Sequence, residues 1–183
     1  MRTSLELFIL ALVQRNVGTP YELRNKTGVS LGSATPVLVR LEKEGLIKGS
    51  EPGSRRSRKF SLTAKGAKAL EQEWAEHLET RPTDVDSILR IAFLGWLHGA
   101  EDKTAKFMAT AADGLRGWAG SLQAEAERLA ATLGVEPDGD AYKWLRACYE
   151  ARKAEADAVA LVELAGQIKN KTKNRKKPSP KHR

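Results

Sequence analysis

The order of short periodic segments in residues 4–62 constrains the fold of this chain more than any other feature of its sequence. Over residues 4–14, apolar residues recur with the 3.6-residue period of a helix, and they cover so much of its surface that the helix is expected to be buried on most sides. Thr19 and Pro20 suit the N-cap and first turn of a second, short helix, which is expected to end at Gly28. The chain is therefore predicted to begin with two helices joined by a connection of only a few residues.

A third helix is expected from about Ser33 to Glu44, with Gly45 as its C-terminal stop. Its start is inferred from Pro36, because a proline is tolerated best in the first turn of a helix. One side of this helix carries apolar residues, and the other side carries small and basic residues. Such a narrow outer face has dimensions that allow it to enter the major groove of DNA, which is about 12 Å wide.

Residues 46–50 are predicted to be one strand and residues 58–62, which alternate polar and apolar residues, a second. An arginine-rich turn with Pro52 and Gly53 separates them. Together they form a hairpin with arginines at its tip. Three helices followed by such a hairpin are the plan of a winged helix-turn-helix, in which the hairpin is the wing. The predicted fold class is therefore mainly α, with a winged helix-turn-helix domain over residues 1–81.

The second half of the chain is expected to be all-helical. Helices are predicted over residues 84–99, over residues 101–133 as one helix or two, and over residues 140–168. The middle segment repeats large and small apolar residues every seven positions, which is typical of a helix that packs closely against another helix. These residues are Met108, Ala112, Leu115, Ala119, Leu122, Ala126, Leu129 and Leu133. We expect residues 84–168 to form a second domain and residues 169–183 to be a disordered basic tail.

The net charge of +8 is distributed unevenly. Residues 1–66 carry 12 basic and 5 acidic side chains, residues 67–168 carry 11 and 18, and residues 169–183 carry 8 and none. A basic first block joined to an acidic second block favours a nucleic-acid partner for the first, because the acidic part must face away from phosphate. The tail is expected either to add salt-dependent affinity for DNA or to remain solvated.

The remaining composition points away from several other classes of protein. The single cysteine, Cys148, excludes an internal disulfide and, together with the lack of a secretion signal, favours a cytoplasmic location. His77, His98 and His182 lack metal-ligand spacing and no catalytic motif occurs, so we expect no enzyme, no metal site and no cofactor. The longest apolar run is too short to cross a membrane and is expected to be a core helix rather than a signal peptide.

Nine residues are candidate DNA contacts. Those on the third helix would face the groove, and those in the wing form a cluster of positive charge that favours an anionic partner. Tyr21 could contact a phosphate through its hydroxyl group or pack against the third helix. The candidates are Tyr21, Ser33, Thr35, Pro36, Arg40, Arg55, Arg56, Arg58 and Lys59.

Trp96, Trp118 and Trp144 lie in the helical half of the chain. They could line a pocket for a small aromatic effector at a subunit interface. The alternative is that they are ordinary core and seam residues, and the sequence favours this second interpretation.

Four runs in the first half of the chain occur together in a known family. They are Leu7 to Leu12 (LFILAL), Pro20 to Leu23 (PYEL), Gly32 to Ile47 (GSATPVLVRLEKEGLI) and Leu62 to Gly66 (LTAKG). With these runs, the segment from Leu5 to Leu70 resembles the PadR-type transcriptional regulators. The resemblance implies a DNA-binding winged helix, a helical C-terminal region that dimerises and, most often, repression. Thr35 stands where that family usually has a tyrosine.

We therefore predict a homodimeric, sequence-specific regulator of transcription that binds double-stranded DNA, and we expect it to be a repressor. Two other functions stay open. One is a winged-helix module that docks on another protein, which would not need four basic residues in the wing with Arg40 on the same side. The other is a nonspecific nucleic-acid binder driven by the tail, which would lose all nucleic-acid binding without residues 169–183.

Overall fold

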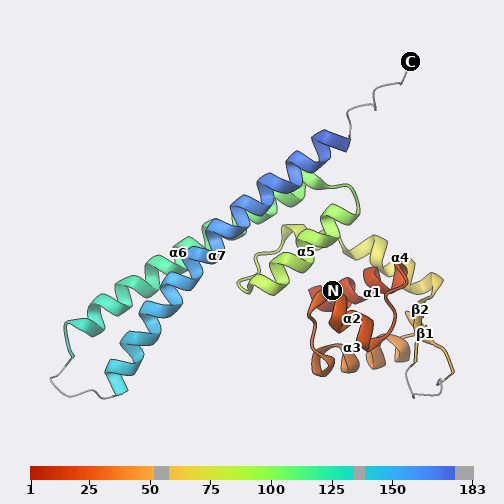
Figure 1. The fold of residues 1–183 in the computed structure, drawn as a ribbon, viewed down its shortest axis with the longest axis horizontal. Coiled ribbons are helices and arrows are strands. Elements are labelled where there is room, and N and C mark those ends of the chain that lie inside the picture. Colours follow the sequence, from red (N-terminus) through yellow and green to blue (C-terminus); the bar gives the residue numbers. More distant parts are fainter. Residues whose placement is uncertain (52–57, 134–138, 176–183) are drawn as a thin grey trace. The chain divides into compact units, whose positions relative to one another are not determined.

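The computed structural model of the chain describes residues 1–51, 58–133 and 139–175, and the chain divides into two compact units (Figure 1). The first unit consists of Met1–Thr80 and Leu89–His98, and the second consists of Arg81–Ile88 and Gly99–Arg183. Helix α5 (Val85–Leu97) therefore contributes its first turn to the second unit and the rest of its length to the first. None of the helices in the described ranges is long and apolar enough to span a membrane.

The first unit has the predicted order of helices and strands. Antiparallel strands β1 (Ile47–Gly49) and β2 (Phe60–Leu62) pair with Lys48 opposite Ser61, so the wing is present as a two-stranded hairpin. The prediction of a mainly α fold with a winged helix-turn-helix is confirmed, while Arg55 and Arg56 at the wing tip lie outside the described residues. The elements are α1 (Ser4–Gln14), α2 (Pro20–Thr27), α3 (Leu31–Lys43), β1 (Ile47–Gly49), β2 (Phe60–Leu62), α4 (Ala64–Glu73) and a 3-10 turn (Glu76–Glu79).

Side-chain caps determine where these short helices begin. Thr3 and Thr19 each form a capping box, in which the threonine hydroxyl accepts a backbone amide and a glutamate three residues later accepts the threonine amide. Ser30 caps α3 and Thr63 caps α4 with the hydroxyl group alone, without the reciprocal glutamate. Each cap contributes about 1 kcal/mol, so the sequence defines these helix starts locally.

Helix α3 begins two residues earlier than predicted, because Ser30 rather than Ser33 is its N-cap. The hydroxyl oxygen of Ser30 accepts the amide of Ser33 at 3.1 Å. Pro36 consequently lies in the second turn, where it cannot donate a hydrogen bond to the carbonyl of Gly32. Gly32 is exposed, so solvent can reach the carbonyl that Pro36 leaves without its helical partner.

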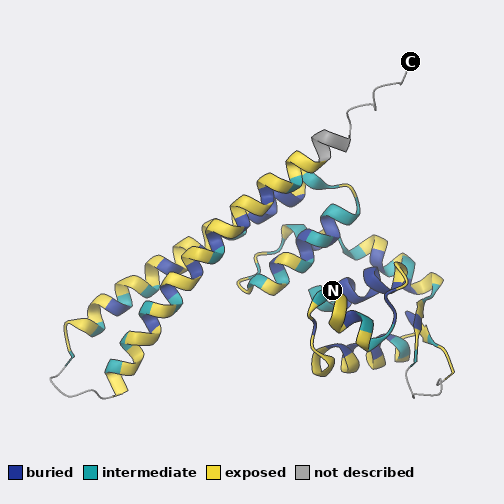
Figure 2. Ribbon diagram, viewed as in Figure 1, coloured by how far each residue is buried: buried dark blue, intermediate teal, exposed yellow. Residues whose placement is uncertain are grey.

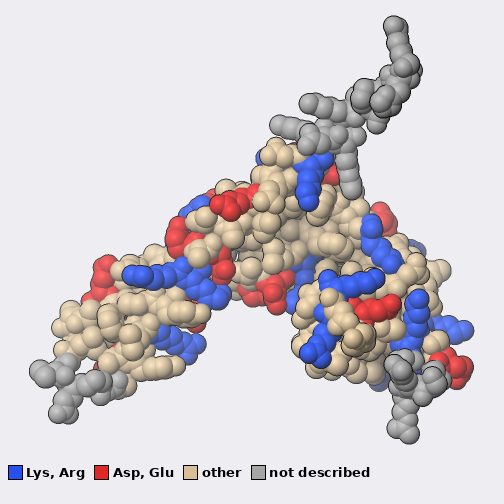
Figure 3. All heavy atoms as spheres, viewed as in Figure 1, with Lys and Arg blue, Asp and Glu red and all other residues tan. Residues whose placement is uncertain are grey.

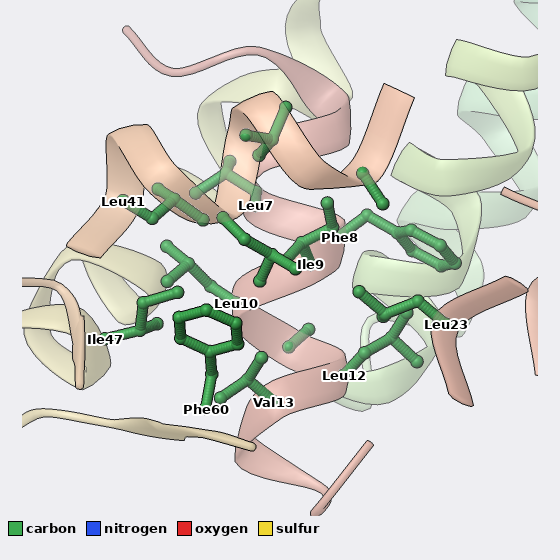
Figure 4. Packing of buried hydrophobic residues seen from close by; sticks show 14 of the residues in the cluster. Leu7, Phe8, Ile9, Leu10, Leu12, Val13, Leu23, Leu41, Ile47 and Phe60 are labelled. Atoms are coloured by element: carbon green, nitrogen blue, oxygen red, sulfur yellow. The ribbon is translucent and has the colours of Figure 1, made fainter. Parts of the chain in front are cut away.

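Helix α1 lies at the centre of the first unit, as its apolar surface predicts. Leu7 and Leu10 are fully buried, and α3, α4 and β2 all contact α1. Leu23 of α2 belongs to the same cluster (Figure 4). Phe8 meets Phe93 of α5 edge to face, with 5.3 Å between ring centroids. This core holds α3 by its buried face and leaves the opposite face in solvent.

The second unit contains a helical hairpin made of α6 (Glu101–Ala130) and α7 (Gly139–Arg175), which run side by side (Figure 1). Helix α6 is continuous through its three glycines, and its seven-residue seam packs against α7, as the dark stripes in Figure 2 show. The partner of the predicted seam is thus a helix of the same chain. Small residues dominate both sides of it: Ala105, Met108, Ala112, Leu115, Ala119 and Ala126 on α6, and Ala147, Ala151, Ala154, Ala158, Leu161 and Ala165 on α7.

Helix α7 extends beyond the expected end at residue 168. The residues that follow continue the helix as far as Arg175, so a disordered tail from residue 169 was predicted too early. Lysine and arginine have good helix propensity and interact favourably with the negative end of the helix dipole. The absence of apolar residues therefore did not prevent helix formation over residues 169–175. Residues 176–183 lie outside the described part of the chain.

Candidate nucleic-acid interface

Helices α2 and α3 contact each other across the short turn Gly28–Ser30, which gives the helix-turn-helix arrangement. Gly28 ends α2 with φ at 75°, a left-handed conformation that favours glycine. The turn leaves α3 with one buried face and one exposed face. The buried face consists of Ala34, Val37, Leu38 and Leu41.

The exposed side of α3 contains all four contacts predicted on this helix. Ser33, Thr35 and Pro36 are exposed, and the side chain of Arg40 is 52% exposed. The hydroxyl group of Ser33 lies 2.9 Å from that of Ser30, so Ser33 also supports the start of the helix. One helix therefore brings these residues to the same side of the unit.

Two further residues belong to this exposed face, Val39 and Lys43. Val39 is 59% exposed, and Lys43 is exposed in the last turn of α3. Both share a stripe with Pro36, because residues three, four and seven positions apart lie on one side of a helix. The side chain of Val39 has no hydrogen-bonding group, so Val39 was not among the predicted DNA contacts. Its spacing of three residues from Pro36 is the sequence feature that places it on this stripe.

Arg40 is anchored to the core by an ion pair with Glu6 of α1. Its Nε donates to Oε1 of Glu6 at 2.7 Å, while Oε2 of Glu6 accepts the amide and the hydroxyl of Thr3 at 2.7 and 2.9 Å. Glu6 itself is only 6% exposed. The same carboxylate thus caps α1 and fixes the direction of the Arg40 side chain. Sequence reasoning could not find this pair, because its members are far apart in the chain.

Burial alone would raise the pKa of Glu6, but the hydrogen bonds from Thr3 and the guanidinium of Arg40 outweigh burial and lower the pKa below its ordinary value of 4.5. A carboxylate with a lowered pKa stabilises the fold above that ordinary value. The contribution is lost as pH falls through the folded-state pKa. Glu6 is therefore charged at neutral pH.

We expect Glu6→Gln to lower the free energy of unfolding by about 1–3 kcal/mol at pH 7, because the negative charge that pairs with Arg40 is lost and the amide nitrogen that replaces one carboxylate oxygen cannot accept a hydrogen bond. The difference from the parent chain should shrink as pH falls below 4.5, since protonated Glu6 resembles glutamine. Urea unfolding at pH 7 and pH 3.5 measures both values. An equal difference at the two pH values would contradict this role of Glu6.

Arg58 has a structural role at the base of the wing. Its Nη1 and Nη2 donate to the two carboxylate oxygens of Glu42 at 2.9 and 2.7 Å, and its Nε donates to the carbonyl of Ser50 at 3.1 Å. These bonds from Arg58, together with the amide of Gly49, lower the pKa of Glu42. The guanidinium also lies over the ring of Phe60. Arg58 thus fastens the wing to the end of α3.

Lys59 is the other predicted wing contact within the described residues, and it is exposed. Lys48 on β1 is also exposed. Strand β1 pairs with β2, and Lys59 directly precedes β2. The wing therefore places lysines in solvent while Arg58 holds its backbone. Arg55 and Arg56 stay predictions.

Most of the acidic side chains in the basic block have partners inside the first unit. Of the five carboxylates in residues 1–66, Glu6 and Glu42 pair with arginines as described, Glu22 accepts the amides of Gly18 and Thr19, and Glu44 pairs with Arg2. The fifth is Glu51. Basic side chains of the same unit lie at the surface, where Figure 3 shows lysine and arginine. Among the described residues of α2, α3 and the wing, the exposed ones besides Arg40 are Arg24, Lys26, Lys43, Lys48 and Lys59.

Tyr21 lies in the first turn of α2 and is 67% exposed. It is therefore not a core residue. Its hydroxyl group is accessible at the surface, and a phosphate contact from Tyr21 stays a prediction.

The three tryptophans lie in different places. Trp96 is half-buried in the first unit, Trp118 is 47% exposed on α6, and Trp144 is half-buried on α7. Within the hairpin, Arg116 of α6 lies opposite Glu155 of α7. Because the two helices run in opposite directions, Trp144 lies beside a part of α6 that is more than two turns beyond Trp118. These two residues do not meet side by side, and an effector pocket stays a prediction.

Comparison with protein-family models gives no match to this chain, and comparison with curated proteins gives none either. Among solved structures, the chain is similar to the crystal structure of Bacillus subtilis PadR in complex with operator DNA. The two chains are 18% identical, and the alignment covers 90% of this chain and 98% of the other with a TM-score of 0.37.

Proposed function

We propose that this chain is a DNA-binding regulator of transcription that inserts α3 into the major groove. The observation that carries this proposal is the exposed face of α3. It is narrow, is made of small residues, and has basic residues around it while the neighbouring carboxylates have partners inside the unit. A phosphate backbone on both sides of the groove would meet this positive rim.

The wing supports the same proposal. Arg58 and Glu42 hold the hairpin against the end of α3, so Lys48 and Lys59 are in a position to contact the phosphates beside the groove that α3 enters. Such contacts would supply affinity and orientation, while α3 would supply sequence preference.

We further infer that the chain acts as a homodimer and represses transcription. The hairpin of α6 and α7 offers a surface for a second copy, because Tyr142, Leu145 and Tyr149 are exposed at three- and four-residue spacing on the side of α7 that faces away from α6. A dimer would present two copies of α3 to two half-sites. Repression is the outcome that the resemblance of residues 5–70 to the PadR-type regulators implies most often.

The experiment that tests this proposal is selection from random double-stranded DNA by the purified chain, read by sequencing, at about 150 mM salt. A palindromic motif is the expected result, and the spacing of its halves would measure the dimer. If no motif emerges and binding disappears as salt rises, the sequence-specific proposal is wrong.

The same selection with a shortened chain addresses the two other functions. A chain that ends at residue 168 should still select the motif, because α3 and the wing are intact. Loss of all binding in this shortened chain would favour a nonspecific binder driven by the tail. Absence of DNA binding in both chains would favour a protein-docking module.

A further inference from the structure

The exposed face of α3 has few groups that can form hydrogen bonds with base edges. Helix α3 contains no asparagine, glutamine or aspartate, and its residues are described throughout. Arg40 is anchored at Nε by Glu6, and the carboxylate of Glu42 is engaged by Arg58 and Gly49. Asparagine and glutamine, the side chains that most often make the bidentate contact to adenine in the major groove, are therefore absent from this helix.

Apolar groups occupy the middle of the same face. Val39 is 59% exposed, although valine is among the residues most often buried in proteins. The ring of Pro36 and the methyl group of Thr35 lie one turn earlier in the helix, and both residues are exposed. An apolar stripe in solvent gains free energy when another apolar group covers it.

The C5-methyl group of thymine is the one apolar feature that a base pair presents in the major groove. We therefore propose that Val39 is a specificity-determining residue that packs on the methyl groups of thymines in the recognised DNA, with Pro36 and Thr35 beside it. The proposal rests on the proposed function. It adds the chemical feature by which α3 tells A·T pairs from G·C pairs. The positive charge around the stripe, Lys43 included, fits the phosphates on either side of such a groove.

The test uses the full chain and the duplex that it selects, in which each thymine is replaced in turn by deoxyuridine. This exchange removes one methyl group and leaves the hydrogen-bonding edge of the base unchanged. At one or two positions of each half-site, we expect binding by the parent chain to weaken about fourfold, which is the effect of losing one buried methyl group. Fluorescence anisotropy titration measures the change.

The same titration with Val39→Ala should show a smaller response to deoxyuridine at those positions, because the shorter side chain covers less of the thymine methyl group. The matched control is Val162→Ala, which changes an exposed valine on α7 and should retain the full response. Because Val39 is exposed, its variant should unfold at the temperature of the parent chain, so a change in binding is not a loss of fold.

Two results would overturn the inference, and they can be told apart from failure of the proposed function. A selected motif whose thymines can all be replaced without loss, or a Val39→Ala chain that keeps the full response, contradicts methyl recognition while DNA recognition stands. Failure to select any motif overturns the proposed function, and this inference with it.

Discussion

Exchanging Lys43 and Lys59 together for glutamate is expected to weaken binding to the selected duplex about a hundredfold at 150 mM salt, because two phosphate contacts become two repulsions. Lys43 ends the exposed stripe of α3 and Lys59 lies on the wing. Both side chains are exposed, so the free energy of unfolding should fall by only about 1 kcal/mol, mainly because Lys43 lies in the last turn of α3, where a positive charge interacts favourably with the helix dipole. The loss should affect unrelated sequences as much as the selected one, because phosphates carry no sequence information.

The matched control is Lys103→Glu with Lys106→Glu, which makes the same change in charge on exposed positions of α6. This variant should bind within about threefold of the parent chain, because only the long-range, salt-screened part of the attraction is reduced. Salt titration of both variants separates local contacts from overall charge. Equal losses in the two variants would mean that net charge, rather than the α3 and wing surface, determines binding.

Replacing Gly66 by alanine is expected to cost about 3 kcal/mol of stability in the first unit, because the new Cβ has no room. Built on the backbone, this Cβ overlaps the carbonyl oxygen of Leu46 and lies 2.9 Å from a methyl carbon of Leu62. The same carbonyl accepts the amide of Thr63 at 3.0 Å, and Thr63 caps α4. Relief of the overlap would move the start of α4 away from the wing and break this hydrogen bond.

In contrast, Gly117→Ala in α6 is expected to increase the stability of the second unit. No atom lies within 4 Å of a Cβ at that position, and the residue is exposed within a continuous helix. Alanine is favoured there by helix propensity, by up to about 1 kcal/mol. Calorimetric melting of the two variants compares them directly. A Gly66→Ala chain as stable as the parent would contradict the close packing of α4 on the end of β1.

The local features of the first unit could be predicted from the sequence because each depends on neighbouring residues. The threonine cap of α2 and its glycine stop are examples, and so is the burial of α1 on most sides. The predicted start of α3 was two residues too late. Ser30 and Ser33 are both good N-caps, and Pro36 was expected to lie in the first turn of the helix, which favoured Ser33. Ser30 can be the N-cap because Pro36 is tolerated in the second turn. Its missing amide leaves the carbonyl of Gly32 without a helical partner, and Gly32 is exposed to solvent.

The partners of the site residues could not be predicted, because tertiary contacts decide them. Arg40 and Glu6 lie on different helices, and Arg58 at the base of the wing pairs with Glu42 at the end of α3. From the sequence, the arginines of the wing formed one group of DNA contacts, whereas the fold gives Arg58 a structural role. The seam of α6 was predicted correctly, but its seven-residue repeat carries no information on whether the second helix belongs to the same chain or to another copy.

Cleavage of the selected duplex by an iron chelate attached to α3 tests the central claim most directly. In a Cys148→Ala chain, the chelate is attached through Ser33→Cys at the exposed start of α3 or, as a control, through Ala124→Cys on the exposed side of α6. If α3 lies in the major groove, the first reagent cuts both strands within a few base pairs of each half-site, and the second does not cut there. Cleavage spread evenly along the duplex from residue 33, or focused cleavage from residue 124 alone, would contradict the account.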